Sequence, residues 1–558
     1  MPGLDPLKSL AGQCLAALEG PLWLVCLATV SPIALRAVRR IRAAGQGREL
    51  AAVLVLAIAL RFAVPWEPIF WHYPLMNVDA GKELYTRYNS YLPWVVRLLV
   101  FDLHGGFDAA LAFNLVTGVA CIPLLWYAAL AGGHSPRASA LFALLLAVTP
   151  MYVRHSGSDS VYVAILFLYA AAAAAYASLA VGEGGTGAAA LLVSSVLIGM
   201  PIRGESAPVF LGVPLFFLRG DFDLRTVLRP RRPLILLGAA VVFGFVATSA
   251  LQSQSYGERL HLHADTILLG VIVQVLCLPA PAFPSFFPPL IAVPIWIVSI
   301  DLIRRRHWRE LASIHLPIWV GRVPHLFGAA FMSGGLATTG YHIISVVFIL
   351  LASARCTDYL YLRYRRGEFL ADPRRRRIAL SAAALAGLFW CVQAYGYRCI
   401  EGQEMRFLSR ELPRDESTIA VIWDPDPSPG DDCCLSLPYP PLWAEMPRTR
   451  WIVLTLADLD RPEYVRDLHF DYYYPGSTLQ LVDSSTWFTR RWGDASDQER
   501  LRLQRAGLER WRELDALVRR EHKIEPWRSA TVTGHTPSFA HFKDDTVTFQ
   551  IYRSATRQ

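Results

Sequence analysis

Charged residues occupy three breaks between long apolar runs of this sequence. Each break carries a pair: Asp79 with Glu83, Arg154 with Asp159, and Arg203 with Glu205. A carboxylate close to a hydroxyl or amine can act as a general base, and an arginine can hold a phosphate through two parallel hydrogen bonds. Together the three pairs have the chemistry to bind a phosphate-bearing substrate and to take a proton from an acceptor.

Each pair also has a purely structural interpretation. Asp79 can start a helix, because aspartate caps helix N termini well. Arg154 and Asp159 can pair with each other at the ends of two helices. Arg203 can pair with Glu205, although residues two apart in a helix do not face each other. The position of the pairs in the fold therefore decides between the two interpretations.

The composition places these pairs in a membrane protein. Of the 558 residues, 53% are hydrophobic and only 18% are charged, whereas soluble proteins carry roughly 25% charged residues. Several stretches contain no charged residue at all: 109–133, 160–182, 184–202, 233–257 and 323–354. Repeated runs of this length suit membrane-spanning helices and exclude a soluble enzyme, a disordered chain and a β-barrel. The sequence predicts a polytopic α-helical membrane protein with about 11–13 transmembrane helices.

Arginine clusters between the apolar runs set the expected orientation. They fall at 36–48, 219–232, 304–306 and 363–377, and loops rich in Lys and Arg face the cytoplasm. The net charge of +8 alone could indicate nucleic-acid binding, but the position of the arginines in loops between apolar runs argues against it. The expected spans are 50–66, 107–131, 138–153, 160–181, 186–202, 206–218, 233–251, 285–302, 311–329, 338–355 and 378–396. All three charged breaks then lie on the outer face.

Two apolar runs do not fit this scheme simply. The run 21–34 is short for a span, so a membrane-spanning and an interfacial position both stay open. The run 264–280 would reverse the orientation of Arg304 to Arg306 if it crossed the membrane. We therefore interpret it as a re-entrant helix that Pro279 and the prolines after it interrupt.

The composition changes near residue 400. We expect a transmembrane domain over 1–399, with a long first outer loop at 67–106, and a soluble extracytoplasmic domain over 400–558. Strand-like runs at 418–423, 450–456 and 546–552, and a helical pattern at 496–521, predict an α/β or α+β class. The nine cysteines show no metal-ligand spacing, and no glycine-rich phosphate loop is present, so we expect no metal and no cofactor.

The order of these features resembles the GT-C superfamily of polytopic glycosyltransferases. A span ends near Arg61, an aromatic outer loop follows with Asp79 and then Tyr85, and a later turn runs from Pro150 through Arg154 to Asp159. The similar branches are the protein O-mannosyltransferase-like and aminoarabinose-transferase-like bacterial proteins. The resemblance implies that Asp79 is the catalytic base and that Asp159 is a second acid.

The same resemblance implies a set of substrate-binding residues. A basic partner for the donor phosphate falls on Arg154 or Arg203. Two positions depart from the family pattern. Ala80 follows Asp79 where many members have a second acid, and Gly340-Tyr341-His342 replaces a late arginine–tyrosine motif, so His342 is the candidate for that contact. The expected substrate-binding set is Glu83, Arg154, Arg203, Glu205, His342 and Arg61.

The implied activity is transfer of a sugar from a polyprenyl-phosphate donor to a glycan, lipid or protein acceptor outside the cytoplasm. The implied location is the bacterial inner (plasma) membrane, with membrane lipids around the spans. A transporter or flippase is the alternative, but such proteins place ionisable groups midway along their spans. A third possibility is an assembly protein that acts through residues 400–558. The sugar and the acceptor are not specified by the sequence.

The predicted orientation can be measured with reporter fusions. A reporter that is active only outside the cytoplasm should be active when it is fused after residue 397, because the last span, 378–396, leads outward. The same reporter fused within 221–231 should be silent, because that loop is rich in arginine. The opposite pattern would place Asp79 in the cytoplasm and exclude a donor on the outer face.

Overall fold

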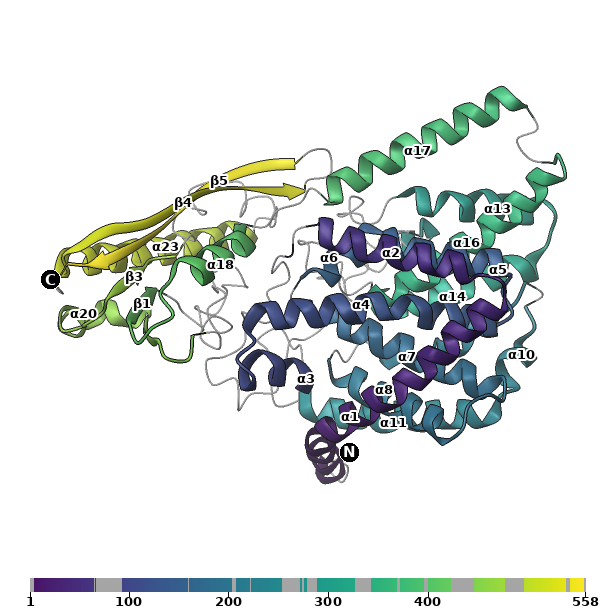
Figure 1. Cartoon of the computed structure of the whole chain (residues 1–558), viewed down its shortest axis with the longest axis horizontal. Helices are drawn as coiled ribbons and strands as arrows, with labels where there is room; N and C mark the ends of the chain where they lie inside the picture. Colours follow the sequence, from purple (N-terminus) through teal and green to yellow (C-terminus); the bar gives the residue numbers. More distant parts are fainter. Residues whose placement is uncertain are drawn as a thin grey trace. The chain divides into compact units, whose positions relative to one another are not determined.

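The computed structural model describes most of the chain. The described residues are 5–64, 66, 93–158, 160–202, 207–220, 222–252, 271–272, 275–277, 289–326, 343–368, 372–395, 400–422, 446–476, 496–537 and 542–555. The chain forms two compact units (Figure 1). The helical unit comprises Met1–Trp66, Arg87–Val95 and Leu111–Gly396, and the C-terminal unit comprises Glu67–Thr86, Val96–Ala110 and Tyr397–Gln558.

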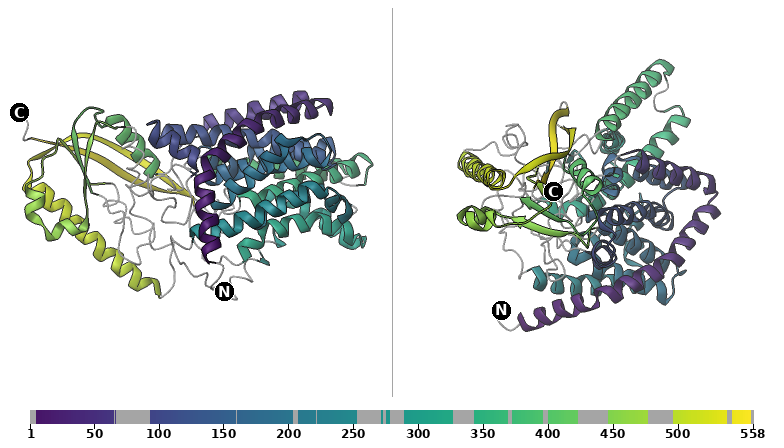
Figure 2. Two further views of the ribbon diagram at one scale, coloured as in Figure 1. Left: turned by 90° about the horizontal axis from the view of Figure 1, so that it is seen from below. Right: turned by 60° about the vertical axis from the view of Figure 1, so that its left-hand side comes forward.

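Apolar helices make up the helical unit. The longer ones are α1 (Asp5–Ala43), α2 (Gly47–Ala63), α4 (Gly106–Ala131), α5 (Pro136–Val148), α7 (Tyr162–Ala180), α8 (Thr186–Ile202), α11 (Arg231–Gln252), α13 (Val293–Arg304), α14 (Trp308–Leu326), α16 (Ile343–Arg365) and α17 (Pro373–Tyr395). The shorter ones are α6 (Pro150–Ser156), α9 (Ala207–Phe210), η3 (Val213–Phe217), α10 (Leu224–Leu228) and η4 (Pro289–Ile291). Helix α3 (Trp94–Arg97) begins in this unit, and η1 (Leu98–Asp102) belongs to the C-terminal unit. In Figures 1 and 2 the long helices run side by side in one bundle, which α1 crosses obliquely.

The prediction of a polytopic helical membrane protein is confirmed. Among the described residues, five helices are long and apolar enough to cross a membrane, and the bent pair of α5 and α6 makes up to six. The larger number of 11–13 spans stays a prediction. The run 21–34 lies inside α1, a helix of 39 residues. Of 264–280, only 271–272 and 275–277 are among the described residues.

One expected span is wrong. The run 206–218 does not form a continuous helix: among its described residues, α9 has four residues and η3 has five. Pro208 and Pro214 each remove a backbone N–H from so short a run, and Gly212 lies between them. A four-residue helix rises only about 6 Å, far less than the roughly 30 Å of a bilayer core.

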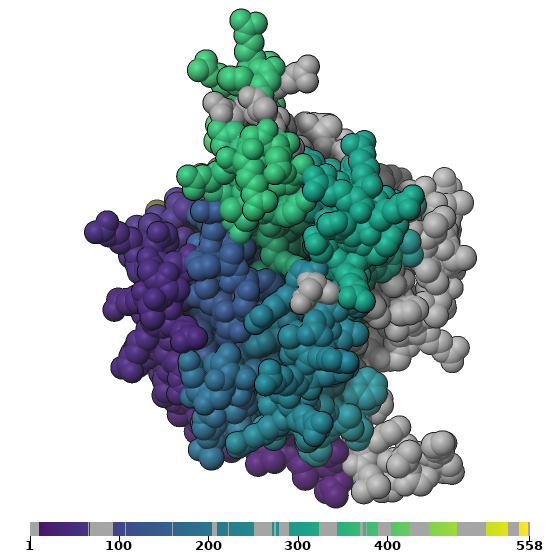
Figure 3. Space-filling model, turned by 90° about the vertical axis from the view of Figure 1, so that its right-hand side faces the viewer, coloured from purple at the N-terminus to yellow at the C-terminus, as the bar shows by residue number. Residues whose placement is uncertain are grey.

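Arginines gather at one end of the bundle, which we call the basic end. Residues 44–46, 132–135, 181–185 and 305–307 join successive helices there, and the neighbouring helix ends carry Arg40, Arg42, Arg137 and Arg304. Figure 3 looks onto this end and shows segments that are far apart in the sequence lying side by side. The end of the bundle to which α2 and α14 run from these turns is called the opposite end.

The helices on the outside of the bundle expose apolar side chains. On α17, Ile378, Leu380, Leu385 and Leu388 are each more than 60% exposed, and α11 likewise exposes Ile235 and Val242. Isolated from other helices over much of its length, α17 stands away from the bundle in Figures 1 and 2. A water-soluble protein rarely exposes so large an apolar surface, whereas lipid solvates it.

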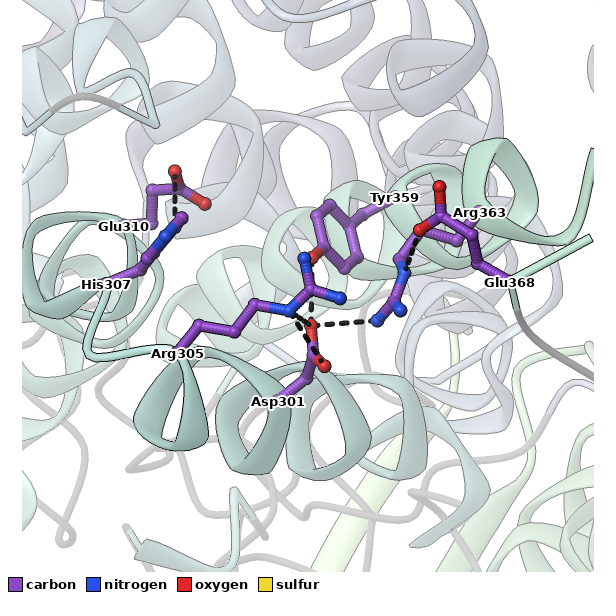
Figure 4. Close-up of polar contacts among 7 residues, drawn as sticks. All are labelled: Asp301, Arg305, His307, Glu310, Tyr359, Arg363 and Glu368. Atoms are coloured by element: carbon purple, nitrogen blue, oxygen red, sulfur yellow. Dashed lines mark hydrogen bonds and ion pairs between the residues drawn. The ribbon is translucent and has the colours of Figure 1, made fainter. Parts of the chain in front are cut away.

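An ion-pair network fastens α13 to α16 at the basic end (Figure 4). The Asp301 carboxylate accepts a hydrogen bond from Tyr359 at 2.9 Å and pairs with Arg363 at 2.9 Å and Arg305 at 3.1 Å. Arg363 also pairs with Glu368 at 3.0 Å. Each carboxylate in this network already has a cationic partner, so we interpret the cluster as a structural clamp on the helix ends.

The C-terminal unit contains a five-stranded mixed sheet with the order β2-β1-β3-β5-β4. The strands are β1 (Thr418–Ile422), β2 (Arg450–Leu454), β3 (Tyr472–Tyr474), β4 (Ile524–Pro537) and β5 (Phe542–Ser554). The helices are α18 (Ile400–Glu411), η6 (Leu456–Asp460), α20 (Pro462–Arg466) and α23 (Ser496–Glu521). Strand β1 pairs in parallel with β2 and β3, and β5 pairs antiparallel with β3 and β4. The prediction of an α/β or α+β unit, with both strands and helices, is confirmed, and so is the predicted helix 496–521.

The core of this unit lies between the sheet and α23. Trp511, Leu514 and Leu517, which the sequence places on one face of the helix, pack with Ala420 and Leu454 of the sheet. Beside this core the hydroxyl of Tyr473 donates a hydrogen bond of 2.7 Å to Asp515. Burial, together with the charge of Asp515, raises the pKa of Tyr473 well above its usual value, so this tyrosine is neutral and acts as a fixed donor.

The structural role of the clamp can be measured with Asp301→Asn. The change removes the charge that Arg305 and Arg363 share, and hydrogen bonds to charged groups contribute about 1.5–3 kcal/mol each. We expect the free energy of unfolding, measured in detergent, to fall by about that amount. Glu310→Gln is the matched control, because Glu310 pairs only with the exposed His307 in this network, and its effect should be small. Equal effects of both changes would contradict the clamp.

Candidate functional site

The predicted site residues divide into two groups. Asp79, Glu83, Asp159, Arg203, Glu205 and His342 lie outside the described residues, so their roles stay predictions. Arg61 and Arg154 are described, and each is only 1% exposed. Arg61 belongs to the last turn of α2, and Arg154 belongs to α6. These two helices contact each other, so the structure brings the two predicted arginines to neighbouring elements.

Arg61 is a buried cation with neutral partners. Its Nη1 donates to the carbonyl oxygens of Ala57 at 3.1 Å and Ala147 at 3.2 Å, and its Nε has no hydrogen-bond partner among the described residues. No described carboxylate forms an ion pair with it. The backbone after Arg61 is closed by Trp66, whose indole N–H donates to the Arg61 carbonyl at 2.6 Å. Because burying an unpaired charge costs several kcal/mol, an anion close to this guanidinium is expected.

A sharp bend carries Arg154 into the interior. Helix α5 ends at Val148 and α6 begins at Pro150, with an angle of 54° between them. Pro150 has no N–H to donate to the preceding turn. The hydroxyl of Thr149 donates a hydrogen bond to the Leu145 carbonyl at 2.6 Å. The sequence predicts that Arg154 lies in a short outer loop. That prediction is wrong, because the chain resumes a helix after Pro150 and buries Arg154.

The turn that follows α6 is held by α4. The side-chain amide of Asn114 donates to the carbonyls of Ser158 at 2.6 Å and Ser160 at 3.0 Å. His155 bonds through Nδ1 to the Ser160 hydroxyl at 2.6 Å. Because Ser158 and Ser160 flank Asp159, these contacts fix the backbone on both sides of the predicted second acid.

A close approach of α4 and α6 accompanies these bonds. A Cβ on Gly118 would lie 2.2 Å from the Ser156 hydroxyl oxygen and 2.9 Å from the Ser156 Cβ. The Ser156 hydroxyl in turn donates to the Tyr152 carbonyl at 2.7 Å. Only glycine leaves room at position 118, so the packing of α6 against α4 depends on it.

Two further hydrogen bonds attach the ends of α16 and α17 to the same bend. The hydroxyl of Tyr152 donates to the carbonyl of Ile343, the first residue of α16, at 2.7 Å. The hydroxyl of Tyr395, at the end of α17, donates to the Val148 carbonyl. Ile343 directly follows His342, so the predicted phosphate contact is adjacent in the sequence to a backbone position that α6 fixes.

The elements around α6 thus form a buried, polar region at the opposite end of the bundle. It contains two guanidiniums, a histidine, an asparagine and several serine hydroxyls, and it is enclosed by α2, α4, α5, α16 and α17. Guanidiniums in such a setting bind anions strongly, because water does not compete. Among the described residues, no three His, Cys, Asp or Glu side chains are grouped to hold a metal ion.

Three further polar residues, which were not predicted as site residues, lie in this region or on an element near it: Asn114, Tyr152 and Arg322. Asn114 and Tyr152 lie in apolar runs and give no signal in a single sequence. Arg322 of α14 gives a clear one, because it is a charged residue within the expected span 311–329, and it is also 1% exposed. The sequence predicts functional charged pairs only at the three breaks. Arg322 shows that a buried charge also lies within a helix.

Comparisons with known proteins give similarity at the level of solved structures. No family model matches the chain, and no curated protein matches it either. The oligosaccharyltransferase of Archaeoglobus fulgidus, tethered to an acceptor peptide, is 13% identical, with 82% of this chain and 71% of that chain covered and a TM-score of 0.42. ArnT from Cupriavidus metallidurans is 13% identical, with 80% of this chain and 95% of that chain covered and a TM-score of 0.44.

A further structure of the archaeal enzyme, with an inhibitory peptide and a dolichol-phosphate, covers 80% of this chain at 13% identity with a TM-score of 0.42. These similar proteins are GT-C membrane glycosyltransferases, the superfamily that the outer-loop residues resemble. At this identity and these TM-scores, the similarity does not establish a shared activity.

The packing of α4 against α6 can be tested with Gly118→Ala. The added methyl group would overlap Ser156, so α6 and the turn at Ser158 must shift. We expect overpacking to lower the free energy of unfolding by about 1–3 kcal/mol. Gly238→Ala in α11 is the control, because its Cβ would meet nothing within 4 Å. Alanine there should leave stability unchanged or raise it by about 0.5–1 kcal/mol. A neutral Gly118→Ala would contradict the close approach.

Proposed function

We propose that the chain is an integral-membrane glycosyltransferase that moves a sugar from a polyprenyl-phosphate donor to an acceptor on the outer side of the membrane. The observation that carries the proposal is the buried guanidinium of Arg61, whose described partners are two neutral carbonyl oxygens. A buried cation in an apolar bundle calls for an anion, and a lipid phosphate is an anion that reaches such a site from the bilayer.

In the proposed reaction the acceptor hydroxyl or amine attacks the anomeric carbon of the sugar. The bond between that carbon and the phosphate oxygen breaks, and the lipid phosphate leaves with the electron pair. Asp79 takes the proton of the acceptor as general base, with Asp159 as a second acid in the site. Arg61, Arg154, Arg203 and His342 are the proposed partners of the phosphate, where charge accumulates as the bond breaks.

The outer face of the bacterial inner membrane is the proposed location. The basic end, with its arginines, is then cytoplasmic, and the bend at Thr149–Pro150 lies towards the outer side. Residues 400–558 are the proposed extracytoplasmic domain. With its own hydrophobic core between the sheet and α23, this domain is suited to bind an acceptor glycan, lipid or protein.

The proposed base is tested by Asp79→Asn. The change keeps the size and hydrogen bonding of the side chain and removes its basicity. Turnover with a radiolabelled polyprenyl-phosphate sugar should fall by a factor of roughly 10² to 10⁴, while the thermal unfolding of the protein stays unchanged. Asp108→Asn, at an exposed carboxylate in the first turn of α4, should retain full activity. Near-normal transfer by Asp79→Asn would remove Asp79 from the mechanism.

A further inference from the structure

Three arginines are among the largest fully buried side chains of the described protein: Arg61, Arg154 and Arg322. All three belong to the helical unit, and each lies on a different element, α2, α6 or α14. Arginine is rarely buried this completely without an anionic or strongly polar environment. Arg322 has no place in the reaction as described so far.

The three arginines lie at one depth. Arg61 stands 14 residues beyond Gly47, the start of α2, and Arg322 stands 14 residues beyond Trp308, the start of α14. Both helices begin at the basic end, so each rise is about 21 Å. Arg154 is reached by about 18 Å along α5 and then by about 6 Å along α6. Because α6 is bent by 54° from α5, the second part adds about 4 Å in the direction of α5, which gives a depth of about 22 Å.

Contacts around the start of α16 connect Arg322 to the other two. Gly321 lets α14 approach α16 closely: its Cβ would lie 2.9 Å from Phe348 and 3.3 Å from the backbone of Ser345. Two residues before Ser345, the Ile343 carbonyl accepts the hydrogen bond from Tyr152, which lies two residues before Arg154. Helix α6 also contacts α2, which carries Arg61. The three guanidiniums therefore belong to consecutive neighbours around one region.

We infer that Arg322 is a third guanidinium of this region and that it binds the phosphate of a lipid donor together with Arg61 and Arg154. The inference rests on the proposed function and adds a residue to its site. Each guanidinium has several N–H donors in one plane, and this planar shape favours paired hydrogen bonds to phosphate oxygens. Because the three arginines lie at a similar depth in the bundle, they also fix the depth at which the phosphate headgroup binds.

Another buried arginine of the same bundle provides a matched control. Arg355 of α16 donates from Nη1 to the Ser313 carbonyl and from Nη2 to the Ser313 hydroxyl, both at 3.1 Å. Ser313 is five residues beyond Trp308, so this guanidinium lies about 8 Å from the basic end. Arg355 therefore has the same charge and a partly buried position, but it lies much closer to the basic end than Arg61, Arg154 and Arg322 do.

The test compares binding of decaprenyl phosphate and the uncharged alcohol decaprenol to the purified full chain in nanodiscs. Wild-type protein should bind the phosphate more tightly than the alcohol. Arg322→Met should lower the affinity for decaprenyl phosphate by about 10- to 100-fold and leave decaprenol binding unchanged. Arg322→Lys keeps the charge but loses the planar pair of N–H donors, so its affinity for decaprenyl phosphate should lie between those of wild type and Arg322→Met. Arg355→Met should retain the wild-type preference.

The outcomes separate the inference from the function on which it rests. If Arg322→Met folds and keeps the wild-type preference for the phosphate, Arg322 does not bind the headgroup, although the proposed donor stands. If wild-type protein shows no preference, the lipid-phosphate donor itself is wrong. Inorganic phosphate should compete only weakly; competition at an affinity equal to that of decaprenyl phosphate would assign the site to a free anion. Unfolding of Arg322→Met leaves Arg322→Lys to decide.

Discussion

The cost of burying positive charge in an apolar helix bundle is the constraint on which the proposed site depends. An isolated ion loses several kcal/mol on leaving water, and it is tolerated where nearby anions or dipoles replace the solvent. Arg61, Arg154 and Arg322 are each about 1% exposed and meet this cost inside the bundle. Other charged groups of the described bundle lie in exposed turns at the basic end, form ion pairs, as around Asp301, or bond to a polar residue, as Arg355 does to Ser313.

The rest of the helical unit can be understood as a frame for these three arginines. At the basic end the ion pairs of Asp301 hold the ends of α13 and α16. At the opposite end the Thr149–Pro150 bend turns α6 inward, and Asn114 and Tyr152 attach it to its neighbours. Gly118 and Gly321 supply the two close helix approaches that these bonds require. We expect a substitution at any of these residues to shift the helices that carry the buried guanidiniums.

The sequence predicts the parts of this fold that follow from hydropathy and helical periodicity. The spans at α4, α7 and α11 follow from uninterrupted apolar runs, and α23 follows from the spacing of Trp511, Leu514 and Leu517. It misses β3, which has only three residues, and β4, whose exposed Thr and Ser residues gain their strand conformation from pairing with β5. Both strands depend on partners distant in the sequence, which a local pattern does not contain.

The site shows the same division between local and distant information. Arg61 and Arg154 are found from residue type and position, but the sequence places Arg154 in a loop, because a proline in an apolar run ends one helix without revealing that another begins. Arg322 is visible as a charge within a span, yet its relation to Arg154 requires the contact between α14 and α16 and the bond from Tyr152 to Ile343. The similar depth of the three arginines emerges only when three helices are measured from a common end.

The most direct test is a cryo-electron-microscopy structure of the full chain in nanodiscs containing decaprenyl phosphate. We expect phosphate density within hydrogen-bond reach of Arg61, Arg154 and Arg322, about 21–22 Å from the basic end. A phosphate bound instead among the exposed arginines of the basic end, with the three buried guanidiniums paired only to protein groups, would contradict it.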